Sequence, residues 1–125
     1  MTPTNRVIVA GSRTLEDYAL VCKTLDPLFA TLPQDDTVIL SGTARGADKL
    51  GERWASEHGY TVIRYPADWT TYGQRAGIIR NEQMALDATH LVAFWDGISK
   101  GTRHMIAAVS GRDIETWVIR FEAQP

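Results

Sequence analysis

The fold of this chain is decided by the stretch Thr37-Val38-Ile39-Leu40-Ser41-Gly42-Thr43-Ala44-Arg45-Gly46-Ala47-Asp48. The apolar run 37–40 predicts a buried strand, and the pattern from residue 46 predicts a helix that ends at His58. A strand that turns through small residues into a helix leaves free backbone N–H groups at the helix start, and the helix dipole there attracts anions, above all phosphate. Arg45 adds a forked positive charge. A plain strand-to-helix turn with glycine for geometry explains the same residues.

Apolar runs and helical spacing alternate along the rest of the chain. Further strands are predicted at 6–10, 60–65, 90–95 and 115–120. The first helix is expected to start with Thr14 as its N-cap and to kink or break near Pro27. The third helix is expected over roughly 74–87, and the fourth after residue 102 with Gly111 as its cap. This alternation predicts an α/β fold: one three-layer domain over residues 1–125 with a parallel sheet of about five strands.

Composition narrows the classes of function. The net charge is −2, which argues against nucleic-acid binding by charge alone. The single cysteine, Cys22, excludes an internal disulfide and a cysteine-based metal site, and no other spacing suggests a metal. There is no signal peptide and no apolar run long enough to span a membrane. We therefore expect a soluble, cytoplasmic protein with no membrane partner.

Three glycine-bearing loops follow predicted strands: 11–13, 41–48 and 96–102. In a parallel sheet all three lie on the rim formed by the carboxyl ends of the strands, where such folds bind ligands. The last loop resembles a phosphate cradle with hydroxyls from Ser99 and Thr102, although a capped turn is the alternative. It is not a P-loop, and the first strand lacks a dinucleotide fingerprint.

Other residues near this rim have two interpretations each. Arg13 either contacts an anion or is a solvated surface charge. Arg80 shares a helix face with Met84, so we expect its charge to point to the cleft rather than to water. Asp68 could hold ribose hydroxyls and Trp69 could stack on a base, unless Trp69 only pins its loop.

The predicted ligand-binding residues are Gly11, Ser12, Arg13, Ser41, Gly42, Thr43, Arg45, Gly46, Asp48, Asp68, Trp69, Arg80, Asn81, Trp95, Asp96, Gly97, Ser99, Gly101 and Thr102. No nucleophilic triad is legible. The candidate catalytic acids are Asp68, Asp96 and Glu82.

Five segments in order, 9–13, 41–48, 65–69, 80–84 and 94–102, resemble the YspA/cpYpsA-related branch of the SLOG superfamily. The resemblance implies a Rossmann-like fold and a site for nucleotides or nucleotide-derived ligands. Three functional types of this superfamily are similar to the chain: LOG-type phosphoribohydrolases, DprA-type proteins that load single-stranded DNA, and sensors of ADP-ribose-like signals.

The resemblance to the hydrolases is incomplete. Their helix motif begins with an arginine, as here at Arg80, but the position of their catalytic glutamate holds Met105. A thioether cannot act as a carboxylate.

The leading hypothesis is therefore a sensor, carrier or sequestering protein for an AMP-, ADP-ribose- or NAD-type ligand, with no required cofactor. A LOG-like hydrolase that cleaves an N-glycosidic or phosphoester bond is the alternative, and single-stranded DNA binding is the second alternative. As in the superfamily, we expect a homodimer or higher homo-oligomer, in a bacterial or phage-infected bacterial cell.

Overall fold

The structure is a computed structural model that describes residues 2–123. The part described contains a five-stranded parallel sheet in the order β3-β2-β1-β4-β5. The strands are β1 (Asn5–Gly11), β2 (Thr37–Ser41), β3 (Thr61–Arg64), β4 (His90–Trp95) and β5 (Glu115–Arg120). The α/β prediction, Rossmann-like in arrangement, is confirmed.

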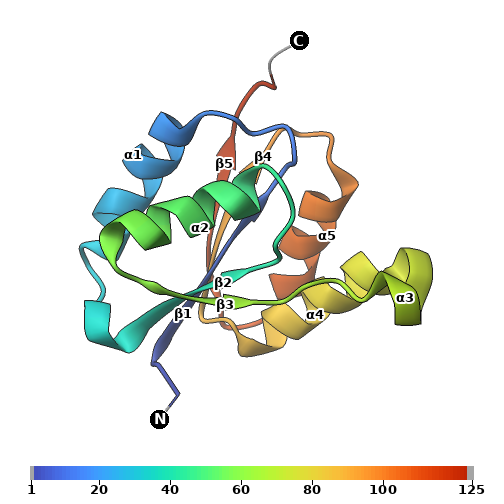
Figure 1. Cartoon of the computed structure of the whole chain (residues 1–125), viewed down its shortest axis with the longest axis horizontal. Helices are drawn as coiled ribbons and strands as arrows, with labels where there is room; N and C mark the ends of the chain where they lie inside the picture. Colours follow the sequence, from blue (N-terminus) through green and yellow to red (C-terminus); the bar gives the residue numbers. More distant parts are fainter. Residues whose placement is uncertain (1, 124–125) are drawn as a thin grey trace.

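Helices cover both faces of the sheet (Figure 1). These are α1 (Tyr18–Phe29), α2 (Ala47–His58), α4 (Ala76–Asp87) and α5 (Lys100–Val109), with the one-turn helix α3 (Trp69–Tyr72) and 3-10 turns at Gln34–Asp36 and Gly73–Arg75. Figure 1 places α1 and α2 on one side of the sheet and α4 and α5 on the other, so the molecule has three layers.

Alternate residues of each strand point into two separate cores, because successive side chains in a strand face opposite sides. On the α1/α2 side, Val7 and Val9 pack with Trp54. On the α4/α5 side, Ile8 and Leu40 pack with Met84. The three central strands are buried on both faces, which explains their continuous apolar runs.

The beginning of the first helix differs from its prediction. The N-cap of α1 is Asp17, whose carboxylate accepts a hydrogen bond from the backbone N–H of Leu20 at 3.0 Å. Thr14 instead donates its hydroxyl to Asp96 at 3.1 Å. The prediction of Thr14 as N-cap was wrong because a partner 82 residues away in the chain binds its side chain. The helix includes Pro27 and ends two residues later.

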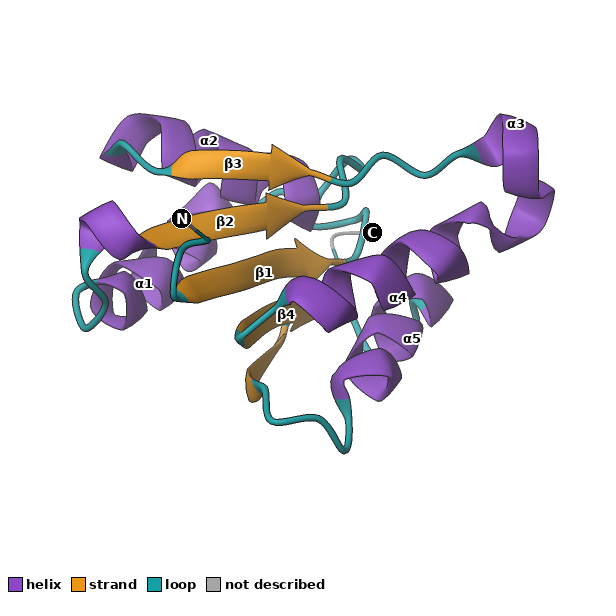
Figure 2. Cartoon of the chain, turned by 90° about the horizontal axis from the view of Figure 1, so that it is seen from below, coloured by secondary structure: helices purple, strands orange, loops and turns teal. Residues whose placement is uncertain are grey.

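The strand order reverses beside β1. The chain leaves β1 toward β2 on one side, whereas β4 pairs with the other edge of β1. Loops after these strands diverge and open a crevice at the carboxyl ends of the sheet. Figure 2 shows the strand arrows pointing toward this end, where α3 projects from the body.

Candidate functional site

A cavity of about 310 Å³ lies at the carboxyl ends of the central strands. Its lining comes from the loop after β1, the loop after β2, one face of α4 and the first turn of α5. The lining residues are Ala10, Gly11, Ser12, Arg13, Thr14, Gly42, Ala44, Asp48, Arg80, Asn81, Met84, Ser99, Lys100, Gly101, Thr102 and Met105. All three glycine-bearing loops therefore contribute to one cavity.

Ser12 ties these loops together. Its backbone carbonyl accepts from the N–H of Ala47 at 3.3 Å, at the start of α2. Its hydroxyl accepts from the N–H of Asp96 at 3.1 Å and lies 3.4 Å from the hydroxyl of Thr102. Because Ser12 is buried, these bonds are protected from water and fix the relative positions of the loops.

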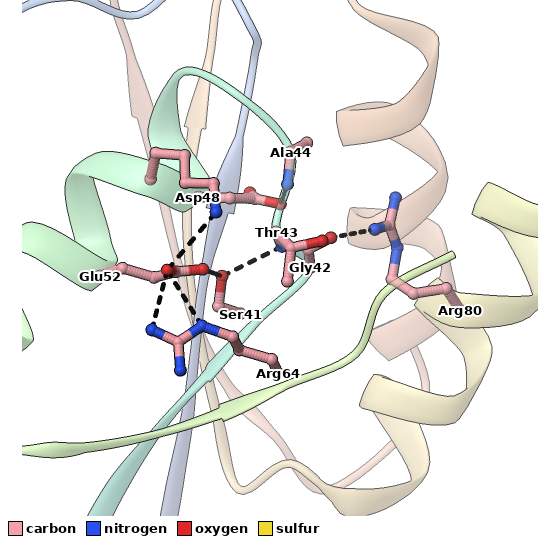
Figure 3. Close-up of polar contacts among 9 residues, drawn as sticks. Ser41, Gly42, Thr43, Ala44, Asp48, Glu52, Arg64 and Arg80 are labelled. Carbon is pink, nitrogen blue, oxygen red and sulfur yellow. Dashed lines mark hydrogen bonds and ion pairs between the residues drawn. The ribbon is translucent and has the colours of Figure 1, made fainter. Parts of the chain in front are cut away.

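The loop after β2 is held by a carboxylate behind it. Glu52 of α2 accepts a hydrogen bond from the Ser41 hydroxyl at 2.6 Å and pairs with Arg64 of β3 at 3.1 Å. The Ser41 hydroxyl in turn accepts from the N–H of Thr43 at 3.1 Å (Figure 3). Thr43 has a φ of 66°, a left-handed conformation that is unfavourable for a β-branched residue. The network around Glu52 stabilises this conformation.

Two nitrogens of the Arg80 guanidinium are held by hydrogen bonds. Nη1 donates to the carbonyl of Gly42, and Nε donates to the side-chain oxygen of Asn81 at 2.9 Å. Asn81 also donates to the carbonyl of Gly101 at 3.3 Å, in the first turn of α5. The arginine is thus positioned before any ligand arrives, and little side-chain entropy remains to be lost on binding.

Asp48 is a buried carboxyl group in the wall of the cavity, only 6% exposed. Burial raises its pKa to about 6, although the hydrogen bond from the N–H of Ala44 and the charge of Arg80 act in the opposite direction. Within residues 2–123 it is the only carboxylic acid that lines the cavity. The group therefore changes its charge near neutral pH.

The first turn of α5 faces the cavity with free donors. The N–H groups of Lys100, Gly101 and Thr102 make no backbone hydrogen bond within the part of the chain described, and no side chain caps the helix. A Cβ built on Gly101 meets no atom within 4 Å. This turn has the donors, the dipole and the open space that an anion such as phosphate requires.

Asp96 shapes that turn and does not reach the cavity. Its carboxylate accepts from the N–H groups of Ile98 and Ser99 and from the hydroxyls of Ser99 and Thr14. Desolvation works against ionisation here, but these hydrogen bonds outweigh it and hold the pKa of Asp96 well below its usual range. A carboxylate so fully occupied is a poor general acid.

The floor of the cavity is apolar. Met84 and Met105 are buried beneath it together with Ala10. Met105, which the resemblance aligns with the glutamate of the hydrolases, belongs to the core on the α4/α5 side. The floor can contact a ring or a sugar face but supplies no acid.

A second cavity, of about 350 Å³, adjoins the first. Both share Arg13, Gly42, Ala44 and Arg80 as lining residues. The second is further lined by Thr43, Arg45, Pro66, Ala67 and Trp69. We call the first the inner cavity and the second the outer cavity.

Cationic side chains line the two cavities. Arg13, Arg45, Arg80 and Lys100 line one or both of them, and none forms an ion pair with a carboxylate among residues 2–123. Three cationic side chains elsewhere, Lys49, Arg53 and Arg64, pair with glutamates. Burial and the nearby charge of Arg13 lower the pKa of Arg80, while Asp48 raises it. An anionic ligand would neutralise this excess of positive charge.

Most of the predicted ligand-binding residues lie on these two cavities. The inner cavity brings together Gly11, Ser12, Arg13, Gly42, Asp48, Arg80, Asn81, Ser99, Gly101 and Thr102. The outer cavity adds Thr43, Arg45 and Trp69.

The remaining predicted residues have other contacts. Ser41 is turned to Glu52, and the Asp68 carboxylate caps α3 by accepting from the N–H of Thr71 at 3.1 Å. Hydrogen bonds from the Thr71 side chain and backbone lower the pKa of Asp68. Trp95 donates its indole N–H to the carbonyl of Ser99 at 3.1 Å. Glu82 is exposed on α4 and lines neither cavity.

Two predicted glycines are required by the conformation of the backbone, and one of them by packing as well. Gly46 has a φ of 79°, and a Cβ there would lie 2.5 Å from the Ser12 carbonyl oxygen. Gly97 has a φ of 85°, which strains any other residue, while the nearby atoms belong to the flexible end of Arg120. They shape the loops rather than line the cavities.

Several lining residues were not predicted: Ala10, Thr14, Ala44, Met84, Lys100, Met105, Pro66 and Ala67. Most adjoin a predicted residue in the sequence, so widening each motif by one position would find them. Glu52 and Arg64, which support the loop after β2, could not be found from the sequence in this way, because their contact depends on α2 packing beside β3.

No helix in residues 2–123 is long and apolar enough to cross a membrane. Over the same residues, no group of three or more His, Cys, Asp or Glu side chains is placed to hold a metal ion.

Comparison with known proteins identifies the family of this chain. No solved structure matches the chain significantly. The gene 61 protein of Mycobacterium phage D29 is 35% identical over 126 residues, which cover 96% of this chain and 98% of the phage protein. Residues 5–72, which include β1, β2, α2 and the Ser41–Asp48 loop, match the sequence model of the YspA, cpYpsA-related SLOG family. This chain therefore belongs to the YspA, cpYpsA-related SLOG family.

Proposed function

We propose that this protein binds a nucleotide or nucleotide-derived ligand of the AMP, ADP-ribose or NAD type, and acts as a sensor, carrier or sequestering protein. Membership of the SLOG family supports a nucleotide-related role. The observation that carries the proposal is the inner cavity itself, where the uncapped first turn of α5 faces unpaired arginines. A phosphate on that turn neutralises charge and pairs free donors at once.

The positions of the candidate catalytic acids favour binding without turnover. Asp96 accepts several hydrogen bonds in a turn, Asp68 accepts one as the cap of α3, and Glu82 lies outside the cavities. Met105 contributes a thioether to the cavity floor. Hydrolysis of an N-glycosidic bond generally uses a positioned carboxyl group, often two.

The experiment is a titration with AMP, ADP-ribose and NAD, each followed by calorimetry and by thermal unfolding, with the products separated chromatographically after long incubation. We expect binding and a raised Tm, with the ligand recovered intact. Absence of binding to all three at low salt would contradict the proposal.

A hydrolase is the second candidate, and one observation favours it: Asp48 is a protonatable acid inside the inner cavity. In this reaction water adds across the C1′–N bond, with hydroxide going to C1′ and a proton going to the base. Asp48 would give that proton and regain one from the water. Release of adenine or nicotinamide that disappears in Asp48→Asn, while ligand affinity persists, would establish this function in place of binding alone.

A further inference from the structure

The outer cavity is as large as the inner one but differs in chemistry. Among residues 2–123 no carboxyl group lines it, and its lining combines cationic side chains with one aromatic ring, Trp69. This combination suits an anion next to a planar group, because an indole face stacks on rings and arginines contact phosphates. The proposed binding of a nucleotide in the inner cavity leaves these features unused.

Trp69 is placed as a platform more than as a core residue. It is 54% exposed, whereas Trp54 in the core is 1% exposed. The tip of its ring lies over Gly77 of α4, where an added Cβ would be 3.7 Å from Cη2 of Trp69. Absence of a side chain at Gly77 leaves the ring in contact with the helix while much of it faces solvent.

Arg80 links the two cavities. Its Nη1 and Nε are engaged by Gly42 and Asn81, whereas Nη2 has no hydrogen-bond partner among residues 2–123. The position of a Cβ on Gly77 is 3.8 Å from Nη2, so the unengaged nitrogen lies on the side of Trp69. Arg13 borders both cavities as well. The shared wall therefore presents positive charge between the two cavities.

We propose that the ligand is two-headed: a nucleoside joined through a pyrophosphate to a second ring-bearing group, with the bridge across Arg13 and Arg80, one head in the inner cavity and a planar head stacked on Trp69. The inference rests on the proposed function, since it needs a nucleotide in the inner cavity. The first turn of α5 and the arginine wall are separate anion-binding elements. A ligand with one phosphate satisfies one of them, and a pyrophosphate satisfies both.

The test compares AMP, which has one head, with NAD, which has two, on the wild-type protein, Trp69→Ala, Trp69→Phe and Tyr72→Ala. Tyr72 is the matched control, because it is an exposed aromatic residue of the same short helix that lines neither cavity. Loss of one base–aromatic stack weakens binding by about tenfold or more. We expect NAD to bind about tenfold more tightly than AMP.

Trp69→Ala is expected to remove the advantage of NAD while the affinity for AMP changes less than about twofold. Trp69→Phe should keep most of the advantage, and Tyr72→Ala should resemble the wild type. Circular dichroism and Tm show whether each variant is folded. ADP-ribose, whose second head is a sugar without a base, should fall between AMP and NAD.

The outcomes separate the two proposals. If AMP binds but NAD binds no more tightly, or if Trp69→Ala weakens both equally, the two-headed ligand is excluded and the single-nucleotide site stands. If neither AMP, ADP-ribose nor NAD binds the wild type, both proposals fail.

Discussion

At the scale of single residues, Asp48 is the group whose surroundings most change its chemistry. Its carboxyl is buried between the loop after β2 and Arg80, and Glu52 of the same helix adds a like charge. Arg80 and the N–H of Ala44 stabilise the charged form, yet desolvation prevails and the pKa rises from 3.8 to about 6. The folded protein therefore holds a proton that the unfolded chain releases at lower pH.

This proton predicts a pH dependence of stability. Between about pH 4 and pH 6 the folded state binds more protons than the unfolded state, so the free energy of unfolding falls as the pH rises. The loss of stability from ionising Asp48 is absent below the pKa that the group has in the unfolded chain. It is complete above the pKa in the folded protein, where it amounts to about 3 kcal/mol. We expect Asp48→Asn to become more stable relative to the wild type as the pH rises across this window. Urea unfolding of both proteins at several pH values measures the difference. A constant difference would contradict the raised pKa.

The same group predicts a pH dependence of binding. An anion in the inner cavity disfavours the charged form of Asp48, so the affinity for NAD should rise several-fold from pH 8 to pH 5.5. NAD suits this test because its pyrophosphate keeps its charge over that range. In Asp48→Asn the affinity should be independent of pH, and a persistent slope would assign the effect to another group.

Gly42 gives a third prediction at this scale. A Cβ at this position would lie 2.8 Å from both Nη1 of Arg80 and Oδ2 of Asp48. Gly42→Ala should therefore displace the Arg80 guanidinium and lower NAD affinity by about tenfold, while overpacking costs about 1 kcal/mol of stability. Gly111→Ala is the control, because its φ of 79° strains the backbone far from the cavities without changing affinity. Calorimetry and thermal unfolding on both variants give the comparison.

At the scale of elements, the ends of helices and strands converge on one rim. Each loop is held by a contact distant in sequence: Ser12 with the N–H of Asp96, and Ser41 with Glu52 of α2. The start of α5 is left open because the Asp96 carboxylate caps the preceding turn instead of the helix. Its free donors thus face the inner cavity.

The open turn predicts the effect of a side chain at Gly101. Gly101→Val places its Cβ where no protein atom lies within 4 Å, and valine has a better helix propensity than glycine, so the fold should persist. Access to the N–H groups should be lost, and NAD affinity should fall by at least about tenfold. Ala107→Val, an exposed change on the same helix, should bind as the wild type does. Equal binding by both variants would place the phosphate elsewhere.

At the scale of the whole molecule, the sheet and its two helical layers hold the rim rigid. The strands β1, β2 and β4 are buried on both faces, and α2 approaches β1 closely at Gly51. A Cβ on Gly51 would lie 2.6 Å from Cγ1 of Val9. The close approach of this helix sets the position of the loop at its N-terminus.

This contact predicts a coupling between Gly51 and Val9. Gly51→Ala should cost about 1–3 kcal/mol of unfolding free energy despite the better helix propensity of alanine, because α2 must move from the sheet. In Val9→Ala the space for the new methyl already exists, so the double variant should be more stable than the sum of the single changes implies. Urea unfolding of the four proteins measures this coupling. Additive effects would mean that the helix relaxes without contacting Val9.

The sequence by itself determined the architecture and the rim of the sheet on which the candidate site lies. Alternating apolar runs and helical spacing required a parallel sheet, and this topology brings the loops at 11–13, 41–48 and 96–102 to one rim. The strands lie within one or two residues of the prediction, because each is a local apolar run. Glycine at 59 and 111 marked helix ends correctly to within two residues, since both adopt a positive φ.

Only the tertiary structure decided which side chains face the cavities. Asp48, Asp68 and Asp96 look alike as acids near a rim, yet one is buried in the cavity wall and the others cap turns. Thr14 donates to Asp96 instead of capping α1, and Ser41 donates to Glu52. Hydrogen-bond partners far apart in the chain, and burial that depends on helix packing, set the direction and the pKa of each group, and neither is encoded in a local pattern.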